Sequence, residues 1–372
     1  MMDPTRQQKA KEYARIKHRL FALEIILTAL GLVLVLTTGL SVWLRDVVLS
    51  ITTQPFLAIA LYFTIGMIGY GILFLPMAFY SGFILPHRYD LSNQSVQGWV
   101  RDAVKGGVLS LVLGTLVIEG LYLFMYLTPQ WWWLIAATFI VIFTVVLANL
   151  SPILIMPLFF KFIPLDDAEL VQRLMRLTER AKTRVNGVYT MILSDRTTAA
   201  NAAFMGLGNT KRIVLGDTLY GNFTHDEIET ILAHELAHQV HHDIWRAIAV
   251  QAILSVVGFY FTDLVLRAGV AYFGFDGITD LAAMPLLALG LGAFGLLTMP
   301  LGNWYSRQRE VAADQYALEM TRNPQAFISA FEKLADQNLA EIEPEAWVEW
   351  LLYDHPSIGK RLEMGHAFQT PA

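Results

Sequence analysis

The stretch from Thr224 to Trp245 reads THDEIETILAHELAHQVHHDIW and decides how the rest of the chain is interpreted. Thr224 and Glu227 form the T-x-x-E pattern of a capping box just before an apolar run, which predicts that a helix begins here. His234 and His238 are four residues apart, so they lie one above the other on the same face of that helix. At this spacing both imidazoles can reach one metal ion at about 2.0–2.1 Å.

Glu235 makes this histidine pair a candidate catalytic centre. It directly follows the first histidine and can reach a water molecule bound to the same metal, which is the His-Glu-x-x-His arrangement of zinc metallopeptidases. The pentapeptide alone has a competing interpretation, two surface histidines on a solvated helix, because average composition produces it by chance in roughly one or two chains in a hundred of this length. The rest of the chain must therefore decide between a metal site and a surface helix.

The composition is typical of a membrane protein. Of the 372 residues, 55% are hydrophobic and only 16% are charged, whereas about 25% are charged in an average soluble domain. Such an excess of apolar residues does not fit one soluble core and indicates several membrane spans. The absence of cysteine excludes disulfides, thiolate catalysis and cysteine-bound zinc. The net charge of -5 gives no indication of nucleic-acid binding.

Six apolar runs are each long enough to cross a bilayer, which takes about 20 residues. They cover residues 20–44, 56–80, 107–127, 131–160, 244–272 and 281–301. The first run is too long for a signal peptide and has no small-residue cleavage site, so we expect it to be a retained span. We therefore expect an N-terminal membrane region with four spans at residues 1–160. A zinc metallopeptidase region, which includes the last two spans, should follow at residues 161–372.

The basic residues orient these spans. Lys and Arg are concentrated in the segments 1–19, 87–105 and 161–184, whereas the loops 128–130 and 273–280 contain neither. Cytoplasmic loops carry the excess of basic residues in membrane proteins. We therefore expect a multi-pass cell-membrane protein whose two termini and histidine pair all face the cytoplasm.

Four ionisable residues fall within the predicted spans, namely Glu24, Glu119, Asp263 and Arg267. Such groups are costly in lipid and usually face the interior of a helix bundle or a wet cavity. Because Glu24 and Arg267 lie near span ends, we expect their side chains to extend towards the membrane surface. Whether Glu119 faces a polar chamber stays open.

Between the fourth span and the histidine pair, the pattern predicts one helix and a small sheet. Apolar residues repeat with helical spacing from Asp166 to Arg184. The segments Gly187–Leu193 and Ile213–Leu219 alternate like strands. Asn201–Leu207 lies between them and has two interpretations. It is either an edge strand that holds an extended peptide by main-chain hydrogen bonds, or an ordinary core strand with a loop.

A catalytic zinc site needs a third protein ligand beside a water molecule. Because the chain has no cysteine, that ligand must be His, Asp or Glu. Glu310 and Asp314 are four residues apart and share a helix face. One of these carboxylates can bind zinc while the other accepts a hydrogen bond from a ligating imidazole. Alternatively, both belong to a solvated helix in which Arg307 and Arg309 are their partners.

Five segments together carry a resemblance to a known family. They read SDRTTAANAAF, KRIVLGDTL, HELAH, RQREVAAD and DHPSIGKRL, and they begin at residues 194, 211, 234, 307 and 354. With these motifs in this order, nearly the whole chain resembles the type I CAAX prenyl protease family of integral-membrane zinc endopeptidases. The resemblance implies one Zn²⁺ per chain, bound by His234, His238 and Glu310, with Glu235 as the catalytic base.

The resemblance also implies roles for four further residues. Asp314 is implied as a second catalytic residue that supports the site, either by orienting a ligating histidine or by donating a proton to the leaving group. Asn201, His355 and Arg361 are implied to bind the peptide substrate. A large chamber enclosed by the membrane helices is implied as well.

The chain departs from the family pattern at several positions. Ala203 replaces an aromatic residue, Ala237 replaces a glycine of the zinc motif, and Asp243 stands where a further histidine is usual. Asp90 and Leu91 replace a Gly-Phe pair. These changes leave the implied zinc ligands intact and concern the fit of the substrate. Six spans, without an insert before the zinc helix, are typical of a prokaryotic version.

We therefore expect a mainly α polytopic membrane helix bundle with a zincin-like catalytic segment that carries a small β-sheet. The expected function is that of a membrane zinc metalloendopeptidase, which hydrolyses peptide bonds with a zinc-activated water. Its expected partners are the lipid bilayer and a peptide or protein substrate, either prenylated or otherwise membrane-associated, and no nucleic acid.

Two alternative functions remain. The first is a membrane quality-control metalloprotease of the heat-shock type, although such proteins have fewer leading spans. The second is a non-enzymatic membrane protein with a structural metal, although such a site normally has four protein ligands.

Overall fold

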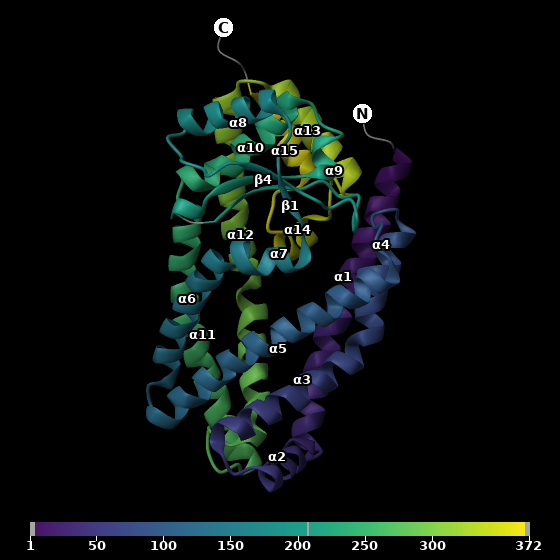
Figure 1. The fold of residues 1–372 in the computed structure, drawn as a ribbon. Helices are drawn as coiled ribbons and strands as arrows, with labels where there is room; N and C mark the ends of the chain where they lie inside the picture. The colour runs from purple at the N-terminus through teal and green to yellow at the C-terminus, as the bar shows by residue number, and fades with distance from the viewer. Residues whose placement is uncertain (1–3, 207, 369–372) are drawn as a thin grey trace.

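The computed structural model describes residues 4–206 and 208–368 and has one membrane end and one compact end (Figure 1). Six helical segments among these residues are long and apolar enough to cross a membrane. They are Pro4–Thr37 (α1), Pro55–Arg88, Val96–Leu127 (α5), Trp132–Phe159, Asp243–Phe273 (α11) and Leu281–Thr321. The second consists of Pro55–Phe79 (α3), Tyr80–Ile84 (η1) and Leu85–Arg88 (α4), the fourth of Trp132–Leu150 (α6), Ser151–Ile155 (η2) and Met156–Phe159 (α7), and the last of Leu281–Ala283 (η4) and Met284–Thr321 (α12). Six apolar segments and the mainly α architecture are thus confirmed, but the first predicted span, residues 20–44, is divided: its helix ends at Thr37, and residues 40–44 belong to the next helix, which follows a left-handed Gly39 (φ 77°).

The remaining elements are short. The helices are Leu40–Ile51 (α2), Ala168–Arg180 (α8), Asp217–Tyr220 (α9), His225–Val240 (α10), Pro324–Gln337 (α13), Ala346–Leu352 (α14) and Ile358–Ala367 (α15), with a 3₁₀ turn at Gly208–Thr210 (η3). The strands are Phe162–Pro164 (β1), Val188–Met191 (β2), Ala202–Met205 (β3) and Arg212–Gly216 (β4). Two π-helical turns, Tyr80–Ile84 (η1) and Ser151–Ile155 (η2), interrupt the second and fourth membrane segments.

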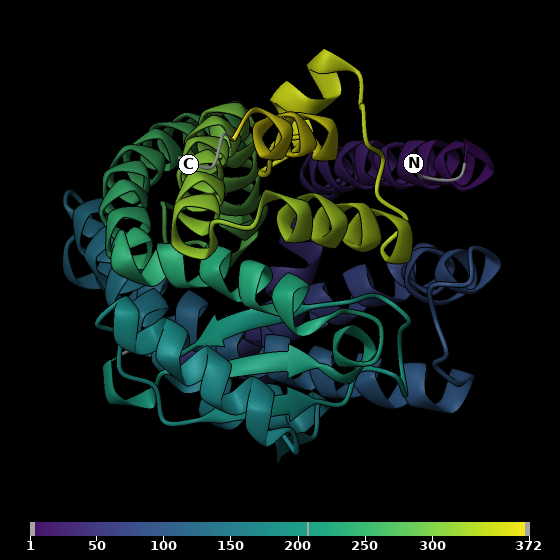
Figure 2. The same cartoon turned by 90° about the horizontal axis from the view of Figure 1, so that it is seen from above.

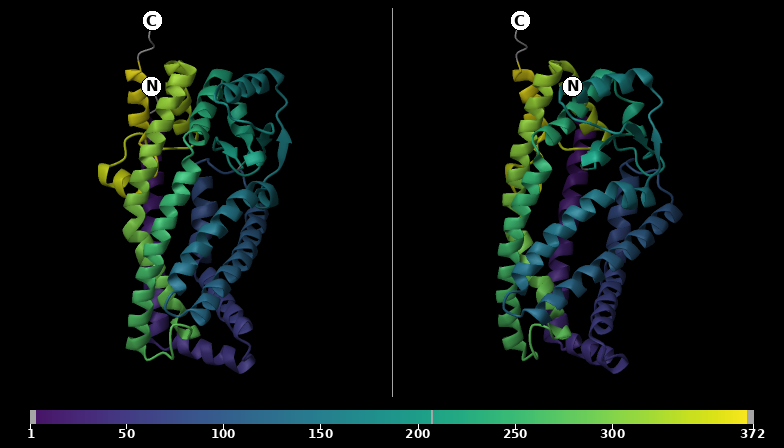
Figure 3. Two further views of the ribbon diagram at one scale, coloured as in Figure 1. Left: turned by 90° about the vertical axis from the view of Figure 1, so that its left-hand side faces the viewer. Right: turned by 60° about the vertical axis from the view of Figure 1, so that its left-hand side comes forward.

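One helix joins the two ends of the molecule. α12 runs unbroken for 38 residues, Met284–Thr321, so it continues well beyond the apolar run that the sequence predicts to end at residue 301. It approaches α11 closely because Gly290 lies opposite Thr262; a Cβ at Gly290 would meet the Thr262 methyl group at 2.9 Å. The helix therefore extends from the apolar segment into the compact end, where it places Glu310 and Asp314 (Figure 3).

The ionisable residues within the spans are mostly paired. Asp263 accepts hydrogen bonds from the Trp132 indole (2.6 Å) and from Arg267 Nε (2.8 Å), and Arg267 also donates to the Pro129 carbonyl. Glu24 accepts a hydrogen bond from the Tyr70 hydroxyl at 3.2 Å. Arg267 therefore reaches a loop between spans, as expected, but it also neutralises a buried carboxylate. Glu119 Oε2 is buried without a hydrogen-bond partner among the described residues.

The compact end is built on a four-stranded sheet in the described part of the chain, in the order β1-β2-β4-β3. β2 and β4 are parallel, and the outer pairs β1–β2 and β3–β4 are antiparallel. β3 is therefore an edge strand, as the first of the two interpretations of this segment requires, while its binding of a peptide stays a prediction. Leu207, the last residue of the predicted segment, lies outside the described residues.

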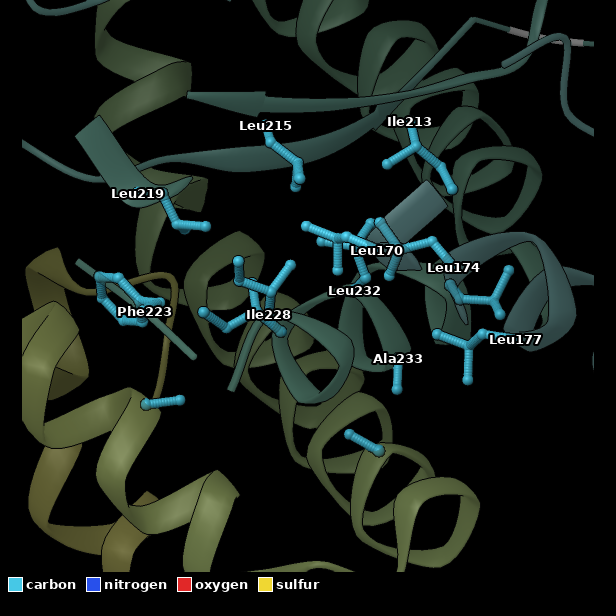
Figure 4. Packing of buried hydrophobic residues seen from close by; sticks show 14 of the residues in the cluster. Leu170, Leu174, Leu177, Ile213, Leu215, Leu219, Phe223, Ile228, Leu232 and Ala233 are labelled. Atoms are coloured by element: carbon cyan, nitrogen blue, oxygen red, sulfur yellow. The ribbon is translucent and has the colours of Figure 1, made fainter. Parts of the chain in front are cut away.

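Helices α8 and α10 cover one face of this sheet (Figure 2). Figure 4 shows the contact at the side-chain level, where Leu170 and Leu174 of α8 meet Ile213 of β4 and Leu232 of α10. These four side chains are at most 1% exposed. The three leucines occupy apolar positions with helical spacing, and Ile213 belongs to the segment with alternating apolar residues. Their contact fixes α10 against the sheet.

The sequence pattern differs from the structure in three local respects. The strand expected at residues 213–219 ends at Gly216, because Asp217–Tyr220 forms a helical turn. β1 is a three-residue strand that the sequence analysis does not predict, since it directly follows the fourth span. The helix of the opening stretch stops at Val240, and a new helix begins at Asp243.

Candidate metal centre

The centre forms where α10 meets α12. Thr224 and Glu227 make both hydrogen bonds of the predicted capping box, which fixes the start of α10. His234 and His238 then share one face of α10, and Glu310 of α12 faces them. Glu310 Oε2 is 3.1 Å from His234 Nε2, and Glu310 Oε1 is 3.4 Å from His238 Nε2.

The donor atoms of this trio fit a metal ion. One ligand atom from each residue lies within 4.8 Å of the others, and among the described residues this is the one such group of three or more His, Asp or Glu side chains. Glu310 Oε2 is buried beside the Nε2 atoms of His234 and His355, at 3.1 and 3.4 Å, but it forms no hydrogen bond of good geometry in the described chain, which is costly unless a cation faces it. Two imidazoles and one carboxylate form the ligand set of a catalytic zinc site that keeps a position open for water.

A buried Arg-Asp pair supports His234. Asp314 Oδ1 lies 2.8 Å from His234 Nδ1. Arg361 Nε donates to Asp314 Oδ2 at 2.8 Å and Arg361 Nη2 donates to Asp314 Oδ1 at 2.5 Å, while the guanidinium stacks on Phe331. When Nδ1 of His234 donates to Asp314, its Nε2 is left with a free lone pair directed at Glu310.

A second Arg-Asp pair, which the sequence pattern does not indicate, supports His238. Asp243 Oδ2 lies 3.0 Å from His238 Nδ1, and Arg309 Nε donates to Asp243 Oδ1 at 2.7 Å. The contact depends on His242, whose left-handed backbone (φ 56°) lies between α10 and α11 and brings Asp243 back to His238. The sequence displays Asp243 as a replacement for a histidine, but it does not show this turn.

Glu235 lines a small cleft beside the metal ligands. The cleft has a volume of about 180 Å³ and lies between α10, β3 and the segment before α15; its walls include Asn201, His234, Glu235, Asn338, His355 and Arg361. Burial raises the pKa of the Glu235 carboxyl, and the neighbouring imidazoles act in the opposite direction. A carboxylate whose pKa moves towards neutrality is better matched to accept and return a proton at pH 7.

The three implied substrate-binding residues all line this cleft, in different settings. Asn201 directly precedes β3, and Asn338 holds that point because it accepts a hydrogen bond from Ala200 N and donates one to Ala200 O. His355 is half exposed, and its Nε2 lies 3.4 Å from Glu310 Oε2. The hydrogen bond with Asp354 raises the His355 pKa. Arg361, in contrast, is buried and directs its guanidinium at Asp314.

Comparison with known proteins is consistent with this geometry. The model of the family described as peptidase family M48 matches residues 164–365, and the model described as CAAX prenyl protease N-terminal, five membrane helices, matches residues 1–161. The uncharacterized metalloprotease YhfN of Bacillus subtilis is 30% identical and covers 97% of this chain and 86% of its own. CAAX prenyl protease 1 of Saccharomyces cerevisiae is 29% identical over 77% of this chain and 67% of its own.

The fold also matches a solved structure. The crystal structure of S. mikatae Ste24p superposes with a TM-score of 0.84, covers 97% of this chain and 89% of that chain, and is 23% identical in sequence. The family models together span both the membrane helices and the compact end. The chain therefore belongs to peptidase family M48, as a membrane-embedded metallopeptidase related to CAAX prenyl protease 1.

Proposed function

We propose that the protein is a zinc-dependent endopeptidase that cleaves a peptide laid along β3, in the manner of the CAAX prenyl proteases. The observation that carries this proposal is the position of Glu235. Its carboxylate shares one cleft with the candidate ligand His234 and with Asn201, the residue at the start of an unpaired sheet edge. A base, a metal position and a surface for an extended peptide thus meet at one place.

His234, His238 and Glu310 would hold one Zn²⁺ per chain. When bound, zinc supplies Lewis acidity, which lowers the pKa of a water to about 7 and polarises a carbonyl. Glu235 takes the proton from the attacking water and returns it to the leaving amine. Asp314 keeps the Nδ1 proton of His234 in place, so that the other ring nitrogen faces the metal position.

The peptide would bind as an added strand. Among the described residues, β3 pairs with β4 on one side only, so the main-chain groups on its other side are available to an extended peptide. His355 is half exposed at the cleft and carries a raised pKa, so its imidazolium can donate a hydrogen bond to the developing oxyanion. Asn201 lies at the start of this strand and would bind the substrate backbone, whereas Arg361 would act mainly through Asp314.

The relatives named CAAX prenyl protease 1 support a protein substrate that is prenylated or otherwise held at the membrane. The substitutions Ala203 and Ala237 lie on β3 and α10, so the fit of the peptide should differ from those relatives. Cleavage of a farnesylated peptide and of the same peptide without the lipid should be compared. A strong preference for the farnesylated form supports CAAX-type processing, and equal rates contradict it.

The mechanism is tested with Glu235→Gln, purified in lipid nanodiscs and assayed for cleavage of a fluorogenic peptide. Zinc content, measured by mass spectrometry of the metal, should stay at one ion per chain. Turnover should fall by about 10²–10⁴-fold, the usual contribution of a general base. Wild-type activity should disappear with a chelator and return with zinc. Near-normal turnover by the variant would exclude Glu235 as the base.

The sidedness of the site is a separate part of the proposal. The described ends of the chain lie at the same end of the molecule as the sheet, and the basic loops favour the cytoplasm for that end. Reporter fusions after Lys105 and Arg184 should then report the cytoplasm, and fusions after Arg45 and Gln130 the outside. A fusion near Asp276 that reports the cytoplasm would contradict the assignment of the last two spans.

A further inference from the structure

A second, larger cavity lies on the other face of the sheet from α10. It has a volume of about 520 Å³, and its walls are Pro157, Leu158, Phe159, Phe160, Lys161, Phe162, Ile192, Asp195, Arg196 and Arg212. Seven of the ten belong to α7, β1 or β4 or lie directly between α7 and β1. Because α7 completes the fourth membrane segment, Trp132–Phe159, the cavity lies where this segment leaves the bilayer.

Two cations at this cavity lack a carboxylate partner. Arg212 and Lys161 form no ion pair with the described residues, and Arg212 Nε is buried without a hydrogen-bond partner among them. The Arg212 guanidinium is held by the rings of Phe162 and Tyr189, with centroids at 4.9 and 5.7 Å, and it donates to the Pro152 carbonyl. A buried charged donor without an acceptor is costly.

The other two charged residues of the wall do not neutralise this pair. Arg196 is already bonded to Asp102, whose Oδ2 accepts from its Nε at 2.9 Å. Asp195 is exposed, makes no ion pair with the described residues, and is the one carboxylate in the wall. The cavity therefore presents an excess of positive charge, fixed in place by aromatic rings.

An apolar surface adjoins the cavity on its membrane side. Ile153, Leu154 and Leu158 are 50%, 58% and 51% exposed on η2 and α7. Lys105 at the start of the third membrane segment donates to the Leu158 carbonyl at 2.7 Å, which fixes α7 against α5. Cations above and exposed aliphatic side chains below match the two parts of a lipid molecule, its headgroup and its acyl chains.

We propose that this cavity binds the phosphate headgroup of a phospholipid from the adjacent leaflet. The phosphate would accept hydrogen bonds from Arg212, because a guanidinium presents its donors in a geometry that matches phosphate oxygens. It would also form an ion pair with Lys161. The acyl chains would lie on Ile153, Leu154 and Leu158. Arg212 alternates along β4 with Ile213 and Leu215, which pack against α10, so a lipid here would tie the sheet to the membrane on the face turned away from the metal centre.

The test measures lipid binding by the intact protein. The protein is first stripped of lipid in detergent, and the binding of added lipid is then measured by native mass spectrometry. Phosphatidylglycerol should bind with a defined stoichiometry, and Arg212→Gln should raise its dissociation constant about 10–150-fold, the usual worth of one charge-assisted hydrogen bond. Lys161→Gln should raise it about fivefold. Arg176→Gln, which removes an exposed cation of α8, is the matched control and should bind like wild type.

Three comparisons decide the proposal. Because Lys161 is exposed, its replacement leaves folding intact and keeps the test valid if Arg212→Gln is unstable. Wild-type affinity of both variants, or equal binding of diacylglycerol, which has no phosphate, would overturn the proposal. Displacement of the lipid by an equimolar amount of glycerol phosphate would also overturn it, since the site would then recognise a soluble phosphate. Failure of glycerol phosphate to compete supports a membrane lipid.

Discussion

The two histidines of the candidate centre are supported by the same chemistry in two different settings. Behind each Nδ1 stands a carboxylate, and behind each carboxylate stands an arginine. For His234 the pair is Asp314 and Arg361, with side chains 0% and 8% exposed. For His238 the pair is Asp243 and Arg309, with side chains 10% and 21% exposed.

The two pairs also differ in how the chain builds them. Each support joins three helices, but Asp314 of α12 is 80 residues from His234 in the sequence and is held by Arg361 of α15. Asp243, in contrast, is only five residues from His238 and is brought back by the turn at His242. Loss of one partner destabilises the protein more when the pair is buried, because the remaining charge is then desolvated and has no counter-ion. The comparison therefore predicts unequal consequences for similar mutations.

The largest effect should come from Glu310, which faces both histidines. Glu310→Ala removes the carboxylate that lies within 3.4 Å of both Nε2 atoms, so zinc affinity and peptidase activity should be lost together. The decrease in affinity should exceed about 100-fold, the upper range for a residue that only supports a ligand. Competition with a chromophoric chelator measures this constant.

The matched control for this variant is Glu319→Ala, an exposed carboxylate on the same helix. It should bind zinc and cleave peptide like wild type. If Glu310→Ala retained one zinc per chain at micromolar protein concentration, another residue would have to be the third ligand. Glu310 would then not be the metal ligand shared by the two histidines.

The next effect concerns Asp314. Asp314→Asn still accepts a hydrogen bond but carries no charge, so Arg361 is left buried without its counter-ion, at a stability loss of up to about 3–5 kcal/mol. If Asp314 orients His234, activity and zinc affinity should both fall about 10–100-fold. If it donates a proton to the leaving group, activity should collapse while zinc affinity stays normal.

A double variant separates positioning from folding at this site. Asp314→Asn with Arg361→Gln removes the unpaired charge, so the thermal midpoint should recover while zinc affinity stays low. Recovery of zinc affinity together with stability would show that Asp314 matters only for folding. If the stability losses of the two single variants simply added up in the double variant, the two side chains would not interact energetically, which contradicts their direct contact.

The features that the sequence displays are those that depend on local spacing. The histidine pair, the capping box at Thr224 and the six apolar segments follow helical periodicity or run length, and the structure forms all of them. Glu310 and Asp314 share a face for the same reason. Family resemblance, rather than spacing, was needed to bring α12 to α10, because a contact between distant helices leaves no periodic signal.

The features that the sequence does not display depend on a single backbone conformation or on tertiary packing. Asp243 reaches His238 because His242 adopts a positive φ, and nothing in the pattern HHD requires that turn. Arg212 forms no ion pair with the described residues, because β4 points it away from α10, towards the end of the fourth membrane segment. The difference between the supports of His234 and His238 is therefore visible only in the structure.

Asp243→Asn should have a smaller effect than Asp314→Asn. The amide still accepts a hydrogen bond from His238 Nδ1, and Arg309 remains partly exposed to solvent, so the free energy of unfolding should change little. Zinc affinity should fall about tenfold, the lower end for a group that orients a ligand. Chelator competition on both variants gives the ranking. A larger loss for Asp243→Asn would reverse the comparison and make His238 the more dependent ligand.

The smallest effect should come from Arg309→Gln, which acts on His238 only through Asp243. Its side chain is 21% exposed, so water can replace part of its hydrogen bond, and a pair of this kind contributes about 0.2–1 kcal/mol. Zinc affinity should therefore fall about fivefold or less, and activity should follow it. Arg309→Gln combined with Asp243→Asn should bind zinc like Asp243→Asn alone, because Arg309 has no separate route to the ligand. A further decrease in the double variant would mean that Arg309, which is adjacent to Glu310 in the sequence, also acts on that carboxylate directly.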